Sequence, residues 1–213
     1  LCAAAAMTAW YAPTEATMGV VQKILYLHLP VALNTFVAAG VVFIASIGYI
    51  WSREPIWDDL AHAAARVAVL YSLVVLLTGM VWARSAWGHW WTWSPRLTFS
   101  LILWLLYVAY LLIRPRMESV QRRALVCAIY GIIAFLDVPL VYMSVKLLPD
   151  IHPASVDLDP RMRDTLLVWC LPVTMLCAGL IWGRYAIAHR ETLDRLTTEE
   201  SSGGLPSRPR EAR

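Results

Sequence analysis

The stretch "VALNTFVAAGVVFIASIGYIW", residues 31–51, decides the fold, because its 21 residues include no charged side chain. Spanning about 30 Å of hydrocarbon as an α-helix takes about 20 mostly apolar residues. The stretch therefore predicts one helix that crosses a membrane.

The composition extends this prediction to the rest of the chain. Of the 213 residues, 59% are hydrophobic and 15% are charged, and the mean hydropathy is +0.57. A soluble domain carries about 25% charged residues. The apolar runs are continuous and do not alternate, which favours helices over a barrel. The sequence predicts an all-α, polytopic membrane helix bundle, whose further spans are residues 67–83, 97–113, 124–148 and 165–188.

A sixth apolar run, residues 1–12, is too short to span a membrane. Because the chain starts with leucine, we expect this run to belong to a first transmembrane helix that begins upstream. The alternative is the remnant of a signal peptide, although no basic region precedes "AAAAM". With this helix the bundle has six transmembrane helices and both termini on the cytoplasmic side.

The basic residues predict the orientation of these helices. Twelve of the 18 lysines and arginines fall in residues 52–66, in residues 114–123 and beyond residue 183. The positive-inside rule places these segments in the cytoplasm, so the loops 13–30, 84–96 and 149–164 lie outside. We expect residues 1–196 to form a single transmembrane domain. Residues 197–213, rich in Gly, Pro and Ser, are expected to form a disordered cytoplasmic tail.

Several familiar motifs are missing from the sequence. It has no CxxCH motif for covalent haem, no Walker A loop, no Gly-rich nucleotide fingerprint and no HExxH. The four cysteines all lie in apolar runs, where cysteine behaves as a small hydrophobe. The positive-inside bias accounts for the net charge of +3, so the expected surroundings are membrane lipid, with no nucleic acid.

Three histidines, His28, His89 and His152, lie one in each predicted outer loop. His28 precedes Pro30 at the start of a span, and His152 lies between two prolines, so both are expected near the membrane surface. Two histidines held at one depth can approach a flat ligand from opposite faces. Haem iron needs only two axial ligands from the protein, whereas zinc takes three or four, and no Cys or Glu cluster completes a zinc site.

The segment "WGHWWTWSPRLTF", residues 87–99, concentrates four tryptophans in seven positions: Trp87, Trp90, Trp91 and Trp93. Aromatic rings stack on the faces of a porphyrin, and arginine forks match its carboxylates. Arg84 and Arg96 bracket the run. The alternative is an interfacial tryptophan belt, as any membrane protein can have, but a belt accounts poorly for four tryptophans inside one loop.

On these residues the chain resembles a known family. "WGHWWTWSPRLT" is similar to the "WWD" signature of the haem-handling membrane proteins of cytochrome c biogenesis. "YLHLPVA", "LTGMVWARSAWGHWWTWSPRLT", "DVPLVYMSV" and "DLDPRMR" follow one another as in cytochrome c maturation protein C, CcmC. The resemblance covers about residues 26–163, and the six-span topology extends it toward both ends.

The resemblance implies how such a protein handles haem. His28 and His152 would be the axial ligands of a non-covalently bound haem b. The platform under the porphyrin would consist of Trp87, Gly88, Trp90, Trp91 and Trp93. Arg84 and Arg96 would hold the propionates.

The resemblance also implies a location and partners. The haem site would face the periplasm or cell exterior from the bacterial inner membrane. The protein would pass haem to the haem chaperone CcmE, and the CcmAB ABC transporter and CcmD would complete the assembly. This transfer is lyase-like at most, and no hydrolytic or nucleotide site is expected.

Three positions depart from the family pattern. Ser94 stands where an aspartate is usual, His89 where a small polar residue is usual, and Leu147–Leu148 where a Trp-Trp pair is frequent. His89 is either a substitute ligand or a hydrogen-bond donor to a propionate. These departures concern the details of haem contact more than its existence.

Asp137 lies in the predicted span 124–148, two residues before Pro139, which deprives the carbonyl of Phe135 of its usual backbone donor. A proton relay and a structural role at a kinked helix are both open for Asp137.

Two rival functions for the whole chain also remain. A b-type haem redox subunit would bury paired histidines in mid-span, and a haem or small-molecule permease would bring charged or broken helices together at the midplane.

Overall fold

The computed structural model describes residues 1–152 and 158–203 of the chain. In that part of the chain, extended pairing is limited to one isolated bridge between Glu15 and Gly19. The helical elements are α1 (Cys2–Ala6), the π-helix η1 (Met7–Tyr11), the 3-10 helix η2 (Val20–Ile24), α2 (Leu25–Ser52), α3 (Pro55–Trp87), α4 (Pro95–Ile113), the 3-10 helix η3 (Arg114–Arg116), α5 (Val120–Phe135), α6 (Asp137–Leu147) and α7 (Pro160–Gly203).

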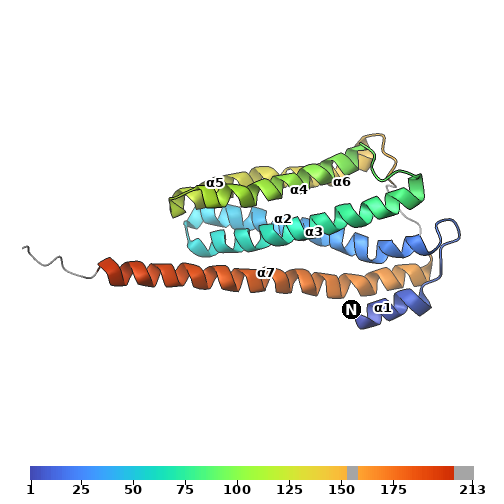
Figure 1. Cartoon of the computed structure of the whole chain (residues 1–213), viewed down its shortest axis with the longest axis horizontal. Coiled ribbons are helices and arrows are strands. Elements are labelled where there is room, and N and C mark those ends of the chain that lie inside the picture. Colours follow the sequence, from blue (N-terminus) through green and yellow to red (C-terminus); the bar gives the residue numbers. More distant parts are fainter. Residues whose placement is uncertain (153–157, 204–213) are drawn as a thin grey trace, which may run out of the picture.

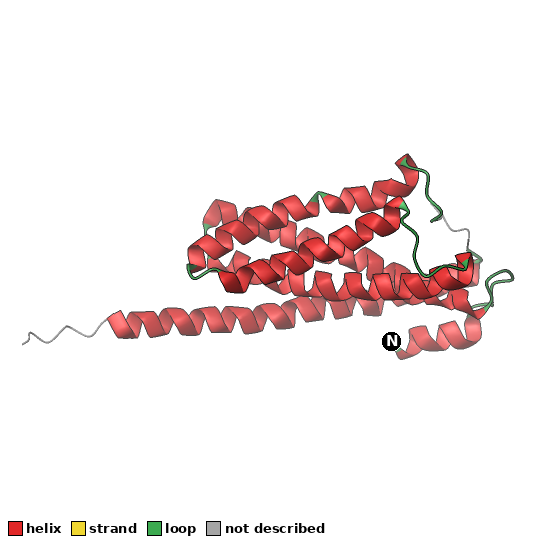
Figure 2. Ribbon diagram, turned by 45° about the horizontal axis from the view of Figure 1, so that its top comes forward, coloured by secondary structure: helices red, strands yellow, loops and turns green. Residues whose placement is uncertain are grey.

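The long helices run side by side as one bundle, with the loops gathered at its two ends (Figures 1 and 2). Each of the five long apolar runs falls in a helical stretch of membrane-spanning length and composition, except that the run 124–148 passes the end of its stretch by one residue. The prediction of a polytopic helical membrane protein is therefore confirmed. The stretches are Val20–Ser52, Pro55–Trp87, Pro95–Arg116, Val120–Leu147 and Pro160–Arg195.

The predicted first helix, residues 1–12, appears in the structure as α1 and η1, which lie alongside α7 (Figure 1). Two hydrogen bonds hold this segment. Trp169 Nε1 donates to Thr8 Oγ1 at 2.8 Å, and Lys23 Nζ donates to the Thr8 carbonyl at 2.7 Å. The segment therefore packs on the bundle, and six spans remain a prediction.

α2 occupies the centre of the bundle and contacts α3, α5 and α7. Close helix approach in a membrane depends on small residues, because lipid provides no hydrophobic drive for helices to associate. Two glycines mark the tightest contacts. A Cβ at Gly48 would lie 2.6 Å from the Trp57 ring, and one at Gly131 would lie 2.6 Å from Ser46 Oγ. Alanines fill much of the remaining core, namely Ala38, Ala39, Ala45, Ala61, Ala64, Ala65, Ala68 and Ala134.

The span 120–147 is broken where the sequence predicted a kink. α5 ends at Phe135 and α6 starts at Asp137, with Leu136 between them. Because Pro139 has no amide hydrogen, the helix cannot continue its regular hydrogen bonding here. Asp137 is buried at the break, and its Oδ2 has no hydrogen-bond partner among the described residues.

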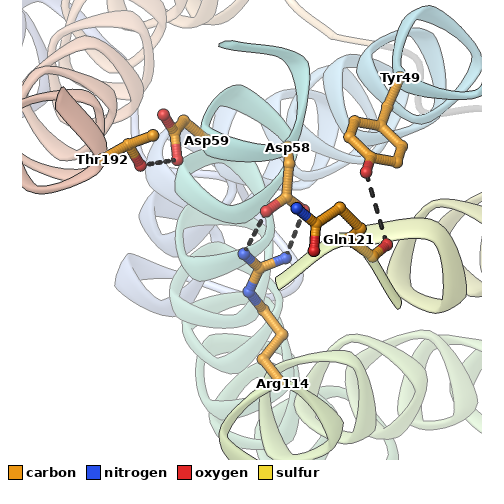
Figure 3. Close-up of polar contacts among 6 residues, drawn as sticks. All are labelled: Tyr49, Asp58, Asp59, Arg114, Gln121 and Thr192. Carbon is orange, nitrogen blue, oxygen red and sulfur yellow. Dashed lines mark hydrogen bonds and ion pairs between the residues drawn. The ribbon is translucent and has the colours of Figure 1, made fainter. Parts of the chain in front are cut away.

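The end of the bundle where α3 begins, which we call the polar end, is joined by two sets of polar contacts (Figure 3). Asp58 forms a bidentate pair with Arg114, in which both N–O distances are 2.7 Å. Asp59 accepts a hydrogen bond from Thr192 Oγ1 at 3.1 Å and lies 3.3 Å from His189 Nδ1. The first turn of α3 is thereby tied to the end of α4 on one side and to α7 on the other.

α7 has 44 residues and extends beyond the other helices at the polar end (Figure 1). The predicted tail begins at residue 197, whereas α7 continues to Gly203; the division into one domain and a tail stays a prediction. Residues 197–202 contain neither Gly nor Pro, the two residues that most readily end a helix. Residues 204–213 of the predicted tail lie outside the described residues.

Candidate functional site

His28 lies inside helix α2, whereas the sequence placed it in the loop 13–30 ahead of a helix start. The 3-10 turn η2 leads directly into α2, so Pro30 falls in the second turn of the helix and not at its beginning. The side chain of His28 is partly buried against α3. A Cβ at Gly79 would lie 3.3 Å from His28 Cε1, so this glycine leaves room for the imidazole.

A hydrogen bond with Thr78 leaves Nε2 of His28 directed to a ligand. Thr78 Oγ1 lies 2.7 Å from the carbonyl of Val74, 3.3 Å from that of Val75 and 2.8 Å from His28 Nδ1. When the hydroxyl donates to a carbonyl, its oxygen can accept from an Nδ1–H group. In that tautomer of the neutral ring Nε2 carries no proton and can ligate a metal.

His152 lies in the connection between α6 and α7 and contacts two tryptophans of α3. Its ring centroid is 6.4 Å from that of Trp82 and 6.4 Å from that of Trp87. The two indoles also meet each other edge to face, with centroids 5.1 Å apart. His152 thus lies against an aromatic pair at the end of α3.

One face of α3 brings the two histidines together. Thr78 and Trp82 are four residues apart, so their side chains lie next to each other on the helix. Thr78 contacts His28 and Trp82 contacts His152. His28 also lies within electrostatic range of His152 and of Arg96. We call this end of the bundle the Trp end; here two segments far apart in sequence bring their imidazoles to a single helix.

The Trp segment, residues 87–94, leaves α3 by a left-handed turn. Gly88 has φ 76°, a conformation that suits glycine, and its amide donates to the Arg84 carbonyl at 3.2 Å. Trp91 and Trp93 pack edge to face, with centroids 5.7 Å apart. Trp90 and Trp93 are 58% and 75% exposed, and His89 is exposed beside them. The segment presents an open aromatic surface.

The two arginines that bracket the Trp segment differ in their contacts. Arg84 donates through its guanidinium to the Gly88 carbonyl and so fastens its own turn. Arg96, in the first turn of α4, donates from Nη2 to the Tyr142 carbonyl at 3.3 Å and is the one within electrostatic range of His28. Of the predicted pair, Arg96 is therefore the better placed to meet a ligand at the histidines.

Asp150 is a member of this site that the sequence did not suggest. Its Oδ1 accepts a hydrogen bond from the His152 amide and its Oδ2 one from the Arg96 amide, both at 2.8 Å. Burial favours the neutral acid, but the amides of His152 and Arg96, together with the nearby Ser94 side chain and the charge of His152, outweigh it and hold the pKa of Asp150 below its usual value. A hollow of about 490 Å³ lies between this loop and the Trp segment, lined by Trp93 and Asp150 among others but by neither His28 nor His152.

The residues at the Trp end fit a flat, acidic, iron-containing ligand. They offer an imidazole Nε2, aromatic faces and a guanidinium. Arg96 Nε and Trp91 Nε1 are buried donors without a partner among the described residues, and a ligand carboxylate would satisfy such groups. In residues 1–152 and 158–203, no three His, Cys, Asp or Glu side chains gather as a metal site built by protein alone would require.

A second hollow, of about 550 Å³, lies between α2, α3 and α7, away from the Trp end. Its lining is apolar apart from a few side chains such as Asn34 and Thr174, and it includes none of the histidines. It therefore adds nothing to the candidate site.

Comparison with known proteins assigns the chain to a family. The family model for CcmC, described as heme exporter protein C, matches residues 1–201. The chain belongs to the heme exporter protein C family. Within this family, the heme exporter protein C of Bradyrhizobium diazoefficiens is 33% identical over 176 residues, which are 79% of this chain and 67% of the relative.

Two further relatives come from other lineages. The heme exporter protein C of Escherichia coli strain K12 is 30% identical over 162 residues, 73% of this chain and 65% of the relative. A ccmC-like mitochondrial protein of cytochrome c biosynthesis from Marchantia polymorpha is 28% identical over 149 residues, 70% of this chain and 63% of the relative. The chain spans about two thirds of the length of these relatives.

Proposed function

We propose that the chain binds haem b non-covalently at the Trp end of the bundle and presents it to the haem chaperone CcmE during cytochrome c maturation. Membership in the heme exporter protein C family supports haem handling in cytochrome c biogenesis. The main structural support for this haem site is that His28 and His152 both contact one face of α3.

The proposed ligand set assigns a task to each group. His28 offers Nε2 when its Nδ1–H donates to Thr78, and His152 offers its ring from the opposite segment. Trp87, Gly88, Trp90, Trp91 and Trp93 form the platform, and Arg96 holds a propionate. When bound, haem supplies the iron and the vinyl group to which a chaperone histidine bonds. The protein binds and orients it.

The exposure of the Trp segment favours a protein that presents haem to a partner over one that retains it permanently. Trp90 and Trp93 have most of their surface free, so a ligand resting on the Trp segment would keep one edge open to a partner. A redox subunit would enclose its cofactor. The site of proposed transfer is thus shallow and outward-facing.

The proposed orientation in the membrane follows from the positions of the lysines and arginines. The positive-inside rule favours a cytoplasmic polar end and a Trp end that faces the periplasm or cell exterior from the bacterial inner membrane. Residues 1–196 would form the single haem-handling domain. CcmAB and CcmD are the proposed further partners.

The first experiment is a haem titration of the detergent-purified protein, followed by visible absorption. His28→Ala and His152→Ala are each expected to weaken and shift the Soret band, because each removes one axial ligand. His62→Ala is the matched control, since His62 is a partly buried histidine on the same helix as Thr78 but near the polar end.

Two results would contradict the proposal. A Soret band unchanged in both ligand variants would remove His28 and His152 from the site and make His89→Ala the next test. Equal weakening in His62→Ala would indicate that the losses reflect general destabilisation and not ligation.

A further inference from the structure

The carboxylate of Asp150 bridges two segments that are distant in sequence. It accepts the amide of His152 on one oxygen and the amide of Arg96 on the other, with both distances 2.8 Å. The first contact lies within its own loop, and the second crosses to the start of α4. A single side chain therefore connects a histidine of the candidate site to the helix that follows the Trp segment.

The contact with Arg96 completes the beginning of α4. The first amides of a helix have no partner inside it, and a side-chain oxygen usually accepts one of them. Ser94 occupies the N-cap position, but its side chain makes no capping hydrogen bond, and Pro95 has no amide hydrogen. The Arg96 amide is thus left for Asp150, whose negative charge also suits the positive end of the helix.

The contact with His152 fixes the direction of its loop. An aspartate that accepts the amide two residues further along forms a turn that sets the backbone in between. This turn carries the His152 ring to Trp82 and Trp87. If the carboxylate is removed, residue 150 no longer accepts the His152 amide, and this turn no longer holds the His152 ring at the end of α3.

We propose that Asp150 is a positioning residue that tethers His152 to the start of α4 and provides the acidic group that Ser94 does not. The inference rests on the proposed function in one respect, namely that His152 ligates haem. The tether itself is a property of the protein without haem, and this allows the two ideas to be tested separately.

The test compares full-length variants in detergent by two measurements. The first is the affinity for haem, with the low-spin electron paramagnetic resonance signal reporting ligation by two histidines. The second is the rate at which diethylpyrocarbonate modifies His152 in the haem-free protein, followed by mass spectrometry. The variants are Asp150→Ala, the same change combined with Ser94→Asp, and Glu15→Ala.

Asp150→Ala is expected to bind haem about tenfold more weakly, as is usual when a group that orients a metal ligand is lost. It should also show less low-spin signal and faster modification of His152. Adding Ser94→Asp is expected to restore the melting temperature by capping α4 while the affinity and the modification rate stay altered.

Glu15→Ala is the matched control. The Glu15 carboxylate accepts the amides of Thr17 and Met18 in a similar turn of another loop. It should leave both measurements unchanged.

Three results would overturn the proposal. In one, His152 is modified in Asp150→Ala at the wild-type rate, which would exclude the tether whether or not haem binds. In another, Ser94→Asp restores affinity as well as stability, which would make Asp150 a helix cap only. In the third, Asp150→Ala loses no affinity although His152→Ala does. If instead the modification rate rises but His152→Ala binds haem like the wild type, the tether stands and the proposed function fails.

Discussion

Separating Arg114 from Asp58 is expected to destabilise the polar end of the bundle strongly. The two side chains meet in a bidentate pair with N–O distances of 2.7 Å, and each is 8% exposed. Two unit charges 4 Å apart attract each other by about 4 kcal/mol at an effective dielectric constant of 20. Arg114→Met leaves the Asp58 carboxylate buried without this partner. Removing one member of a buried pair costs about 3–5 kcal/mol.

The assay is thermal unfolding in detergent, followed by the fluorescence of the 11 tryptophans. For a chain of this size, the expected loss corresponds to a melting temperature lower by about 10 °C. The double variant Asp58→Leu with Arg114→Met is expected to melt close to the wild type, because apolar replacement of a whole buried pair is often neutral. Thr192→Val, which removes one hydrogen bond to Asp59, is expected to cost only about 1 kcal/mol.

The proposed haem site allows a control for this experiment. Asp58 and Thr78 are 20 residues apart on one helix, a separation of about 30 Å. Arg114→Met should therefore leave the haem spectrum of the folded protein unchanged. The reasoning is refuted if the single variant loses less than about 1 kcal/mol, or if the double variant is as unstable as the single one.

Three further variants test the core and the site. Gly79→Val should weaken haem binding more than Gly79→Ala, because added carbons displace the His28 ring, which lies 3.3 Å from a Cβ at Gly79; equal affinities in a haem titration would count against this. Gly131→Ala should cost about 1–3 kcal/mol, since its Cβ would lie 2.6 Å from Ser46 Oγ, and Ser46→Ala should recover part of that loss in the same unfolding assay. Asp137→Asn should preserve folding and haem retention, as a kinked helix requires only a polar side chain there; a folded variant that retains haem but cannot transfer it would support the proton relay instead.

The membrane-spanning architecture could be predicted because it depends on local properties of the sequence. Runs such as 31–51 are apolar over the full thickness of a bilayer, and each is covered, to within one residue, by a helical stretch of sufficient length. The break between α5 and α6 was also predictable, since Pro139 removes a hydrogen bond wherever it occurs. The helices extend past the apolar runs at several boundaries, among them those at His28, at the start of α3 and at residue 197.

The candidate site could be predicted only in part. Its histidines and tryptophans belong to types that attract attention, and Trp82 could have been added, because it lies two residues before Arg84 at the end of the predicted span 67–83. Asp150 could not. It acts through two backbone amides, one of them 54 residues away in the sequence, and neither its type nor its neighbours indicate that contact.

The continuity of α3 has a consequence for how the proposed ligands are released. Thr78 and Trp82 present both histidines to one face of a helix whose 33 residues run without interruption from the polar end. Residues four apart advance about 400° around the helix axis, so Thr78 and Trp82 lie about 40° apart and a rotation of α3 would displace the contacts to His28 and His152 together. Displacing the Trp segment alone would disturb only the platform. Rotation of α3 would therefore release both histidines together. Because α3 crosses the membrane, a force on its first turn at the polar end would act on the histidines on the other side of the membrane.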